Sequence, residues 1–168
     1  MEQFPIQEFV ADFDLPLTIY NRGVGGFTTS EMLACMQDCV YALRPAYIFI
    51  NIGTNDMNST PADADDKPSW MPHLLENYEK ILQACQEKLP EMKIYPINTR
   101  VISMMKDPFL KEKFKTRTNE KVRQANAKIA QLAEQHGCHY IDVNDGLTNN
   151  AGALKPEYTV EGVHMYPN

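Results

Sequence analysis

The stretch AYIFINIG, residues 46–53, decides the fold class of this chain. It is mostly apolar, rich in β-branched and aromatic side chains, and bounded by Pro45 and Gly53. That profile is typical of a strand buried on both faces, as strands are inside a parallel sheet. We therefore expect this strand to lie in a parallel sheet.

The sequence on either side of this strand alternates between strand and helix patterns. Further strands are expected at residues 17–23 (LTIYNRG), 93–99 (KIYPINT) and 138–143 (CHYIDV). Apolar residues at helical spacing predict helices within residues 28–45, 70–90 and 117–137. Thr28 or Thr29 can cap the first helix, while Pro45 and Gly137 are stop signals. This order predicts an α/β fold with helices on both faces of a parallel sheet.

Length and composition narrow the class of protein further. At 168 residues, the chain fits one domain spanning residues 1–168. A net charge of −6 argues against a nucleic-acid partner, and no apolar run is long enough to span a membrane. The first ten residues do not resemble a signal peptide, so we expect a cytoplasmic protein. The four cysteines contain no CxxC pair and are interpreted as small buried side chains, with no metal site.

Ligands of parallel α/β sheets bind at the carboxyl ends of the strands, so the loops there hold the candidate site. NRGVGGFTT, residues 21–29, is rich in glycine and leads into a helix, where backbone N–H groups can hold an anion. IGTND, residues 52–56, places the Asn55 amide at the mouth of the sheet. The alternatives are a structural turn for the glycine loop and an Asx-turn for Asn55. Asp56 is expected to be structural, capping backbone groups or neutralising Arg22.

The closing stretch VEGVHMYPN, residues 160–168, contains an acid three residues before a histidine. Glu161 can bond one ring nitrogen of His164 and leave the other nitrogen free to accept a proton. The histidines at positions 73, 136 and 139 are interpreted as structural. A general base needs a nucleophile within hydrogen-bond reach, and the serines at 30, 59, 69 and 103 do not lie in a Gly-x-Ser turn.

Together, the glycine loop, the G-x-N-D turn after an apolar strand and the acid-x-x-His near the end resemble the SGNH, or GDSL-type, hydrolase family. The resemblance covers most of the chain and implies a flavodoxin-like three-layer sandwich. It implies an oxyanion hole of the Gly26 N–H and the Asn55 amide, with Gly25 as the alternative glycine. It further implies His164 as the base and Glu161, where most of the family has Asp, as the residue that orients it.

The resemblance also predicts what the chain lacks. The family's nucleophilic serine follows a central first strand, and residues 1–10 are similar to the stretch just after it. We therefore expect the serine and that strand just upstream of Met1, and a domain incomplete at both ends. Without the strand, its neighbours would keep unpaired backbone groups at a cost of about 1–3 kcal/mol each.

Two interpretations of function stay open, and a third is disfavoured. The first is an acyl ester hydrolase that acts on acetyl esters, lysophospholipid-like esters or acylated carbohydrate, without a cofactor. The second is a non-catalytic fragment that binds an ester or carbohydrate without turnover. A nucleotide binder of flavodoxin type would rest on the glycine loop alone, because the chain has no GxGxxG or P-loop pattern. The stretches 58–70 and 103–115 are expected to wall the pocket, with Trp70 as a helix anchor or a sugar platform.

Overall fold

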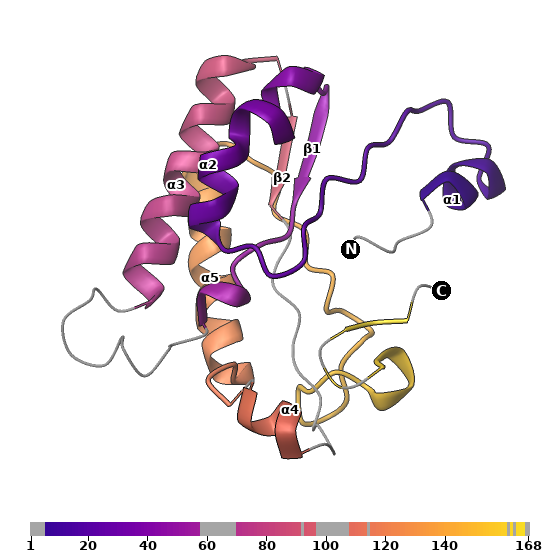
Figure 1. Cartoon of the computed structure of the whole chain (residues 1–168), viewed down its shortest axis with the longest axis vertical. Helices are drawn as coiled ribbons and strands as arrows, with labels where there is room; N and C mark the ends of the chain where they lie inside the picture. Colours follow the sequence, from indigo (N-terminus) through magenta and orange to yellow (C-terminus); the bar gives the residue numbers. More distant parts are fainter. Residues whose placement is uncertain are drawn as a thin grey trace.

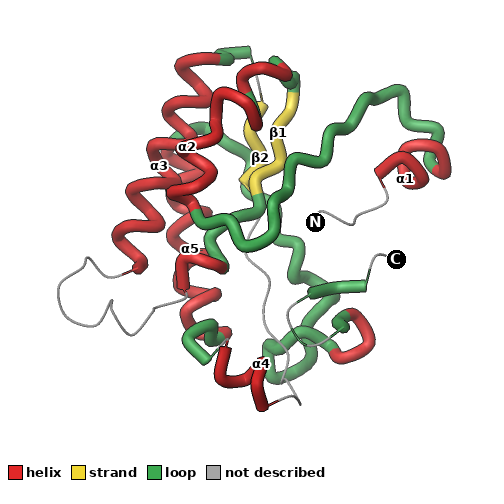
Figure 2. The backbone as a smooth tube through the Cα atoms, in the orientation of Figure 1, coloured by secondary structure: helices red, strands yellow, loops and turns green. Residues whose placement is uncertain are grey.

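The computed structural model describes residues 6–57, 70–91, 93–96, 108–113, 115–160, 162 and 164–166. Helices and long loops make up most of the described chain, and two strands lie side by side (Figure 2). The elements in chain order are α1 (Ile6–Asp12), α2 (Thr29–Cys39), η1 (Tyr41–Leu43), β1 (Tyr47–Ile50), η2 (Asn55–Met57), α3 (Trp70–Lys88), β2 (Lys93–Pro96), α4 (Pro108–Lys113), α5 (Asn119–Gln135) and η4 (Pro156–Tyr158).

The two strands form a parallel pair, as the sequence predicts. Ile48 aligns with Ile94, and Phe49 aligns with Tyr95. The long connection from β1 to β2 contains α3, as parallel strands require. The strand predicted at residues 93–99 is described up to Pro96, and its residues 97–99 lie outside the described residues.

The predicted strand at residues 17–23 is wrong as a ladder-forming strand. These residues are extended, but they form no ladder with any strand in the described part of the chain. Their apolar side chains are largely uncovered, with Leu17 54 % and Tyr20 61 % exposed. Sequence composition favours an extended backbone, whereas a strand also needs a neighbour to accept its hydrogen bonds.

The last predicted strand, residues 138–143, is likewise not a regular strand. It begins beside β2, where the His139 N–H donates to the Ile94 carbonyl at 3.2 Å. The His139 ring stacks on Tyr95 with centroids 5.2 Å apart. The segment thus continues the sheet direction through single contacts rather than through a continuous ladder.

The three predicted helices are confirmed, with small differences at their ends. α2 begins after Thr28, whose backbone N–H donates to the Glu31 carboxylate at 2.6 Å in a capping box. The Thr118 side chain caps α5, and Gly137 ends it at φ +64°, a backbone conformation that glycine adopts without strain. α2 stops before Pro45 and passes into η1. α1 and α4 were not predicted, because each is only about two turns long.

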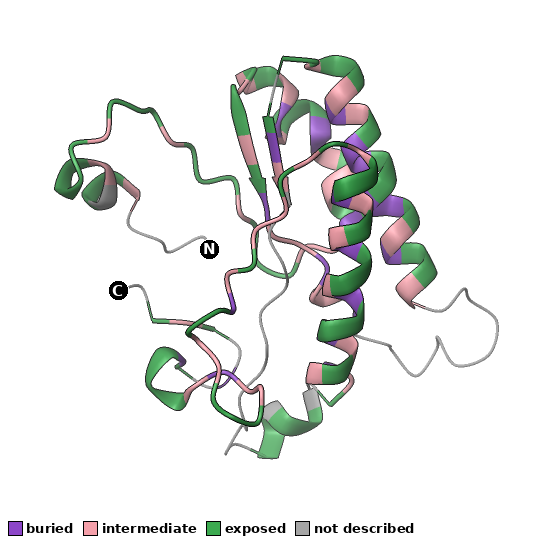
Figure 3. Ribbon diagram, turned by 180° about the vertical axis from the view of Figure 1, so that it is seen from behind, coloured by how far each residue is buried: buried purple, intermediate pink, exposed green. Residues whose placement is uncertain are grey.

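The main hydrophobic core lies between the helices and one face of the sheet. Figure 1 shows α2, α3 and α5 gathered on the same side of β1 and β2. Figure 3 shows that the buried residues of these helices face inward. This cluster consists of Met36, Val40, Ile50, Leu74, Tyr78, Ile81, Leu82, Cys85, Ile94 and Ile129. It holds β1 by its isoleucines, and it fixes the carboxyl end of that strand where the candidate site begins.

Burial of β1 on both faces, as predicted, is wrong for the described part of the chain. Tyr47 is 50 % and Phe49 56 % exposed, on the face opposite the helices. Phe49 stacks on Tyr95 with ring centroids 5.0 Å apart. Three helices cover only one face, so the alternate side chains of β1 form an aromatic surface instead of a second core layer.

The four cysteines are free; Cys85 is buried, as predicted, whereas Cys35, Cys39 and Cys138 are only partly buried. Burial raises the pKa of the Cys85 thiol to about 12, and burial beside Cys39 raises that of Cys35 to about 11. Thiols with such pKa values stay protonated at neutral pH. None of the helices in the described residues is both long and apolar enough to cross a membrane.

Candidate active site

The G-x-N-D turn forms a short 3-10 helix directly after β1. Gly53 takes φ +117°, and the chain then turns into η2 with Asn55 at its start. The Asn55 Nδ2 donates to the Phe27 carbonyl at 2.8 Å, and Asn55 Oδ1 accepts from Arg117 Nη2 at 2.5 Å. The predicted oxyanion asparagine is therefore bound to the glycine loop by its own side chain.

The glycine loop makes a tight turn at the two candidate glycines. The Phe27 N–H donates to the Val24 carbonyl at 3.4 Å, so Gly25 and Gly26 are the central residues of a β-turn. Gly26 takes φ +84°, as the third residue of a type II turn requires. It is exposed, and a Cβ built on it would meet nothing within 4 Å. Its neighbour Phe27 accepts the hydrogen bond from Asn55, so the Asn55 side chain is tied to the residue that follows Gly26.

Asp56 has the structural role expected for it, although not with Arg22. Its carboxylate accepts from the Thr29 backbone N–H at 3.1 Å and from the Thr29 hydroxyl at 2.5 Å. It thereby caps the start of α2, whereas Arg22 donates to the Asp38 carbonyl instead. Burial raises the pKa of Asp56 above its ordinary value, against the opposing effect of the Thr29 bonds.

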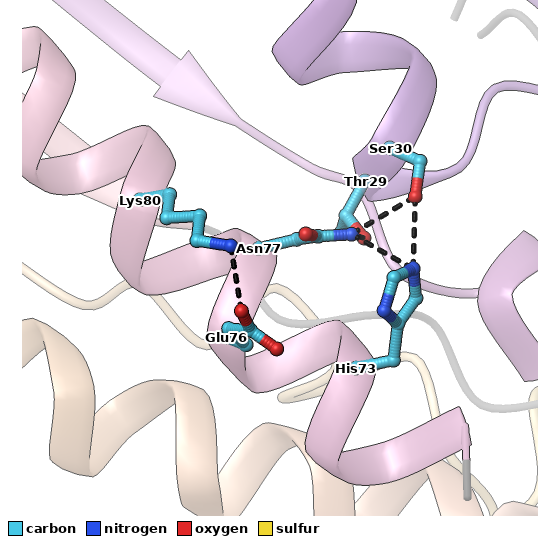
Figure 4. A network of polar contacts seen from close by, with 6 residues as sticks. All are labelled: Thr29, Ser30, His73, Glu76, Asn77 and Lys80. Carbon is cyan, nitrogen blue, oxygen red and sulfur yellow. Dashed lines mark hydrogen bonds and ion pairs between the residues drawn. The ribbon is translucent and has the colours of Figure 1, made fainter. Parts of the chain in front are cut away.

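A polar network joins the starts of α2 and α3 beside this cap (Figure 4). Asn77, which is buried, donates from Nδ2 to the Thr29 hydroxyl at 3.1 Å and to the Ser30 hydroxyl at 3.0 Å. The Ser30 Oγ also lies 3.0 Å from His73 Nε2. Asn77 and His73 are four residues apart on one face of α3, so they reach α2 together. The network packs the two helices, in line with the structural interpretation of His73.

The other two histidines also have structural partners. His136 caps the end of α5, with its Nδ1 3.3 Å from Gln86 Oε1. His139 stacks on Tyr95 at the end of the sheet. These contacts agree with the structural interpretation of both histidines.

His164 lies in a small closing loop with its side chain exposed. Its carbonyl accepts from the Val160 N–H at 2.9 Å and from the Thr159 hydroxyl at 2.7 Å. Thr159 and Met165 form an antiparallel bridge around it. Glu161, the predicted orienting acid, lies outside the described residues. Among the described contacts, no hydrogen bond joins His164 to Gly26 or Asn55, so its role as base stays a prediction.

A second hydrophobic cluster nevertheless ties the closing loop to the Asn55 turn. It consists of Met57, Val122, Ala125 and Leu154, with Trp70, Met71, Leu147 and Met165 packed against it. Met57 is two residues from Asn55, and Met165 follows His164. Both halves of the candidate site are thus anchored to the same cluster. Trp70 also packs against the main core, as the helix anchor that was one of its two predicted roles.

Arg117 is the site residue that sequence reasoning missed. It lies directly before Thr118, the cap of α5, and only 8 % of it is exposed. Burial lowers the pKa of its guanidinium. An arginine next to a helix cap gives no sequence signal for a partner 62 positions earlier in the chain, and that contact exists only in the folded molecule.

Some residues named in the sequence predictions lie outside the part of the chain that the structure describes. Residues 58–69 and 97–107, with Ser59, Ser69 and Ser103, are outside the described residues. In the described residues no cluster of three His, Cys, Asp or Glu side chains is placed to hold a metal ion. What the geometry provides is a glycine turn at Gly25 and Gly26 and, hydrogen-bonded to the next residue, Phe27, the side-chain amide of Asn55.

Comparison with known families identifies the family of this chain. The model of the GDSL-like lipase/acylhydrolase family matches residues 7–168, almost the whole chain. The chain belongs to the GDSL-like lipase/acylhydrolase family. Its α/β fold with a parallel sheet is the SGNH hydrolase fold, and the resemblance inferred from the motifs is confirmed.

Solved structures share the fold of this chain. A protein from Streptococcus pneumonia that is named for platelet activating factor is 30% identical, with a TM-score of 0.80 over 98% of this chain and 72% of that one. A GDSL-like lipase from Bacteroides thetaiotaomicron is 20% identical, with a TM-score of 0.72 over 95% and 71%. The acetyl xylan esterase AlAXEase is 19% identical, with a TM-score of 0.71 over 96% and 81%. The last two show the shared fold, and a search of curated proteins found no match.

Proposed function

We propose that this GDSL family member is an acyl ester hydrolase whose oxyanion hole is formed by the Gly26 N–H and the Asn55 amide. The observation that carries the proposal is the bond from Asn55 Nδ2 to the Phe27 carbonyl, at 2.8 Å. This bond ties the Asn55 amide to the residue that follows Gly26, which supports the proposal that the two donors act on one oxygen. Such paired donors stabilise the tetrahedral intermediate of acyl transfer.

The proposed reaction follows from these groups. A serine hydroxyl attacks the acyl carbonyl carbon while the His164 imidazole accepts its proton. The carbonyl oxygen becomes an oxyanion, bound by Gly26 and Asn55. When the C–O bond breaks, His164 returns the proton to the leaving alcohol, and water repeats the cycle to release the acid. Glu161 orients the imidazole. These steps use acid–base chemistry alone and need no cofactor.

The serine in this scheme is proposed to precede Met1. Ser30, the one serine in the described residues, lies within α2 and is bound to Asn77 and His73. No serine of the sequence follows a glycine at the end of an apolar strand, as the exposed hydroxyl of a nucleophile turn does. The exposed aromatic face of β1 supports a further segment packing there.

Substrates of the proposed enzyme are small acyl esters. Acetyl xylan esterase and the protein named for platelet activating factor are among the chain's structural neighbours. An acetyl group on a sugar and an acetyl group on a phospholipid share one reacting centre, which the proposed oxyanion hole fits equally. We therefore propose acetyl and other short acyl esters as the class.

The test measures hydrolysis of p-nitrophenyl acetate and of longer acyl esters by the gene product that includes the residues preceding Met1. We expect turnover that His164→Ala abolishes and that Asn55→Asp lowers about 100- to 1000-fold in kcat. The Asp side chain keeps an acceptor for Arg117 but places a negative charge where the oxyanion forms.

The matched control is His139→Ala, because His139 is exposed and stacks only on the sheet. It should leave kcat unchanged. A stop codon or unrelated sequence before Met1 would contradict the proposal, as would ester turnover that survives His164→Ala. Binding of an acylated carbohydrate without turnover would favour the non-catalytic alternative.

A further inference from the structure

Arg117 is a buried cation whose guanidinium binds the side-chain oxygen of Asn55, a candidate residue of the oxyanion hole. Its Nη2 donates to Asn55 Oδ1 at 2.5 Å, and the residue is 8 % exposed. It comes from the segment just before α5, whereas Asn55 follows β1. A cation in this position costs free energy to bury, and burial lowers its pKa accordingly. The fold therefore buries a charged group in contact with the Asn55 amide.

The contact determines which way the Asn55 amide points. A guanidinium only donates hydrogen bonds, so the oxygen of the amide must face Arg117. Its NH₂ group then faces the glycine loop, where one hydrogen bonds the Phe27 carbonyl. The NH₂ has two hydrogens, and within the described residues the second has no acceptor. Arg117 thus selects the orientation in which Asn55 presents a donor beside Gly26.

The charge of Arg117 adds to this geometric effect. A hydrogen bond from a cation to Oδ1 is charge-assisted, and it draws electron density from the amide nitrogen. The N–H groups on that nitrogen become stronger donors. Negative charge that develops on a nearby oxygen is therefore stabilised more strongly in the transition state than an uncharged carbonyl is in the ground state.

We propose that Arg117 is a positioning residue of the oxyanion hole, which orients and polarises the Asn55 amide without touching the substrate. The proposal rests on the proposed function of Asn55 and extends it to a residue outside the family's motif positions. It also gives a reason for an arginine directly before the cap of α5. The Thr118 cap and the buried Val122 and Ala125 fix the start of the helix, and this fixes the position of the Arg117 guanidinium.

The first test observes the Asn55 side-chain NH₂ by two-dimensional 1H–15N NMR of the 168-residue chain, with the signal assigned by its loss in Asn55→Asp. In Arg117→Met we expect a shift of this signal and faster exchange of its hydrogens, and in Arg117→Lys a smaller change. Arg123→Met is the matched control, because Arg123 is exposed on α5, the helix that follows Arg117, and pairs with Glu120 at 3.0 Å. An unchanged Asn55 signal in Arg117→Met would overturn the proposal.

The second test measures kcat and KM of the longer gene product for p-nitrophenyl acetate. Arg117→Met should lower kcat about 10- to 100-fold with little change in KM, since a donor used in the transition state is weakened. Arg117→Lys should recover part of the loss, and Arg123→Met should match the wild type. A wild-type kcat in Arg117→Met, or a change in KM alone, would overturn the proposal.

The two tests separate this proposal from the one on which it rests. If the wild type hydrolyses no ester, the proposed function fails, while the NMR comparison still supports or overturns the Arg117–Asn55 contact. If Arg117→Met fails to fold, Arg117→Lys gives both readouts, because it keeps the charge and loses the second arm of the guanidinium fork.

Discussion

Asn55 connects three parts of the chain through a single side-chain amide. It follows β1, binds the glycine loop at Phe27 and accepts from Arg117 ahead of α5. Neither contact is local in sequence. An amide that satisfies partners on both sides is a fixed group, and a fixed donor is what oxyanion stabilisation requires.

Replacing Asn55 should therefore cost stability as well as activity. Asn55→Ala leaves the buried Arg117 donor without this acceptor, and we expect a loss of about 1–3 kcal/mol in the free energy of unfolding. Chemical denaturation measures it. The control Asn150→Ala alters an exposed turn residue and should change stability by less than about 0.5 kcal/mol. Equal stability of both variants would show that the Asn55 bonds contribute nothing.

Asp56 should make stability depend on pH in the acidic range. Its pKa is raised by burial, so the folded state holds the proton to a higher pH than the unfolded state. Its contribution is fully present below the ordinary value of about 4, and it falls as pH rises to the raised pKa. The stability of the wild type relative to Asp56→Asn should thus decline through this window. A stability difference that grows with pH would contradict a raised pKa of Asp56.

At the scale of elements, Met57 joins the Asn55 turn to the closing loop. It is fully buried, and Met165 packs against the same cluster. Met57→Ala should cost about 2–5 kcal/mol through the cavity that it leaves. It should also speed hydrogen exchange at the Val160 N–H, which donates to the His164 carbonyl. If hydrogen exchange at the Val160 N–H stays as slow as in the wild type, Met57 does not anchor the closing loop.

A control for this prediction comes from the other cluster. Met36 lies in the main core and is 4 % exposed. Met36→Ala should cost similar stability but leave Val160 protected under native conditions. Equal acceleration in both variants would mean that the loop opens only by global unfolding.

The contact between α2 and α3 should depend on one buried amide. Asn77→Ala removes bonds to the Thr29 and Ser30 hydroxyls, and we expect it to destabilise the protein by about 1–3 kcal/mol. Lys80→Ala on the same helix removes only an exposed ion pair with Glu76 and should cost less than about 1 kcal/mol. Thermal unfolding compares them. A larger effect of Lys80→Ala would contradict the assigned role of the network.

The helices and strands also show which structural features can be predicted from the sequence. α3 and α5 follow from apolar spacing, and the end of α5 from Gly137, because a helix bonds within itself. The strands at 17–23 and 138–143 were wrong as strands, because a ladder needs a partner elsewhere. Gly26 and Asn55 were predicted from their loops, whereas Arg117 was not, because its partner is remote. The roles of Gly26, Asn55, His164 and Glu161 stay predictions.

At the scale of the whole molecule, the helices cover one face of the sheet and leave an aromatic face. Tyr47 and Phe49 lie there, on the strand that leads to Asn55. The chain spans 72% of the Streptococcus pneumonia protein that it resembles. A serine on a segment before Met1 would thus belong beside β1, at whose carboxyl end the candidate site lies.

The most direct measurement of the central claim is to identify which serine reacts with a fluorophosphonate probe, by mass spectrometry. In the gene product that includes the residues preceding Met1, we expect one labelled serine upstream of Met1, with no label in His164→Ala. The 168-residue chain alone should stay unlabelled. Label on Ser30, which lies 3.0 Å from His73, would contradict the account, as would the absence of label from the longer product.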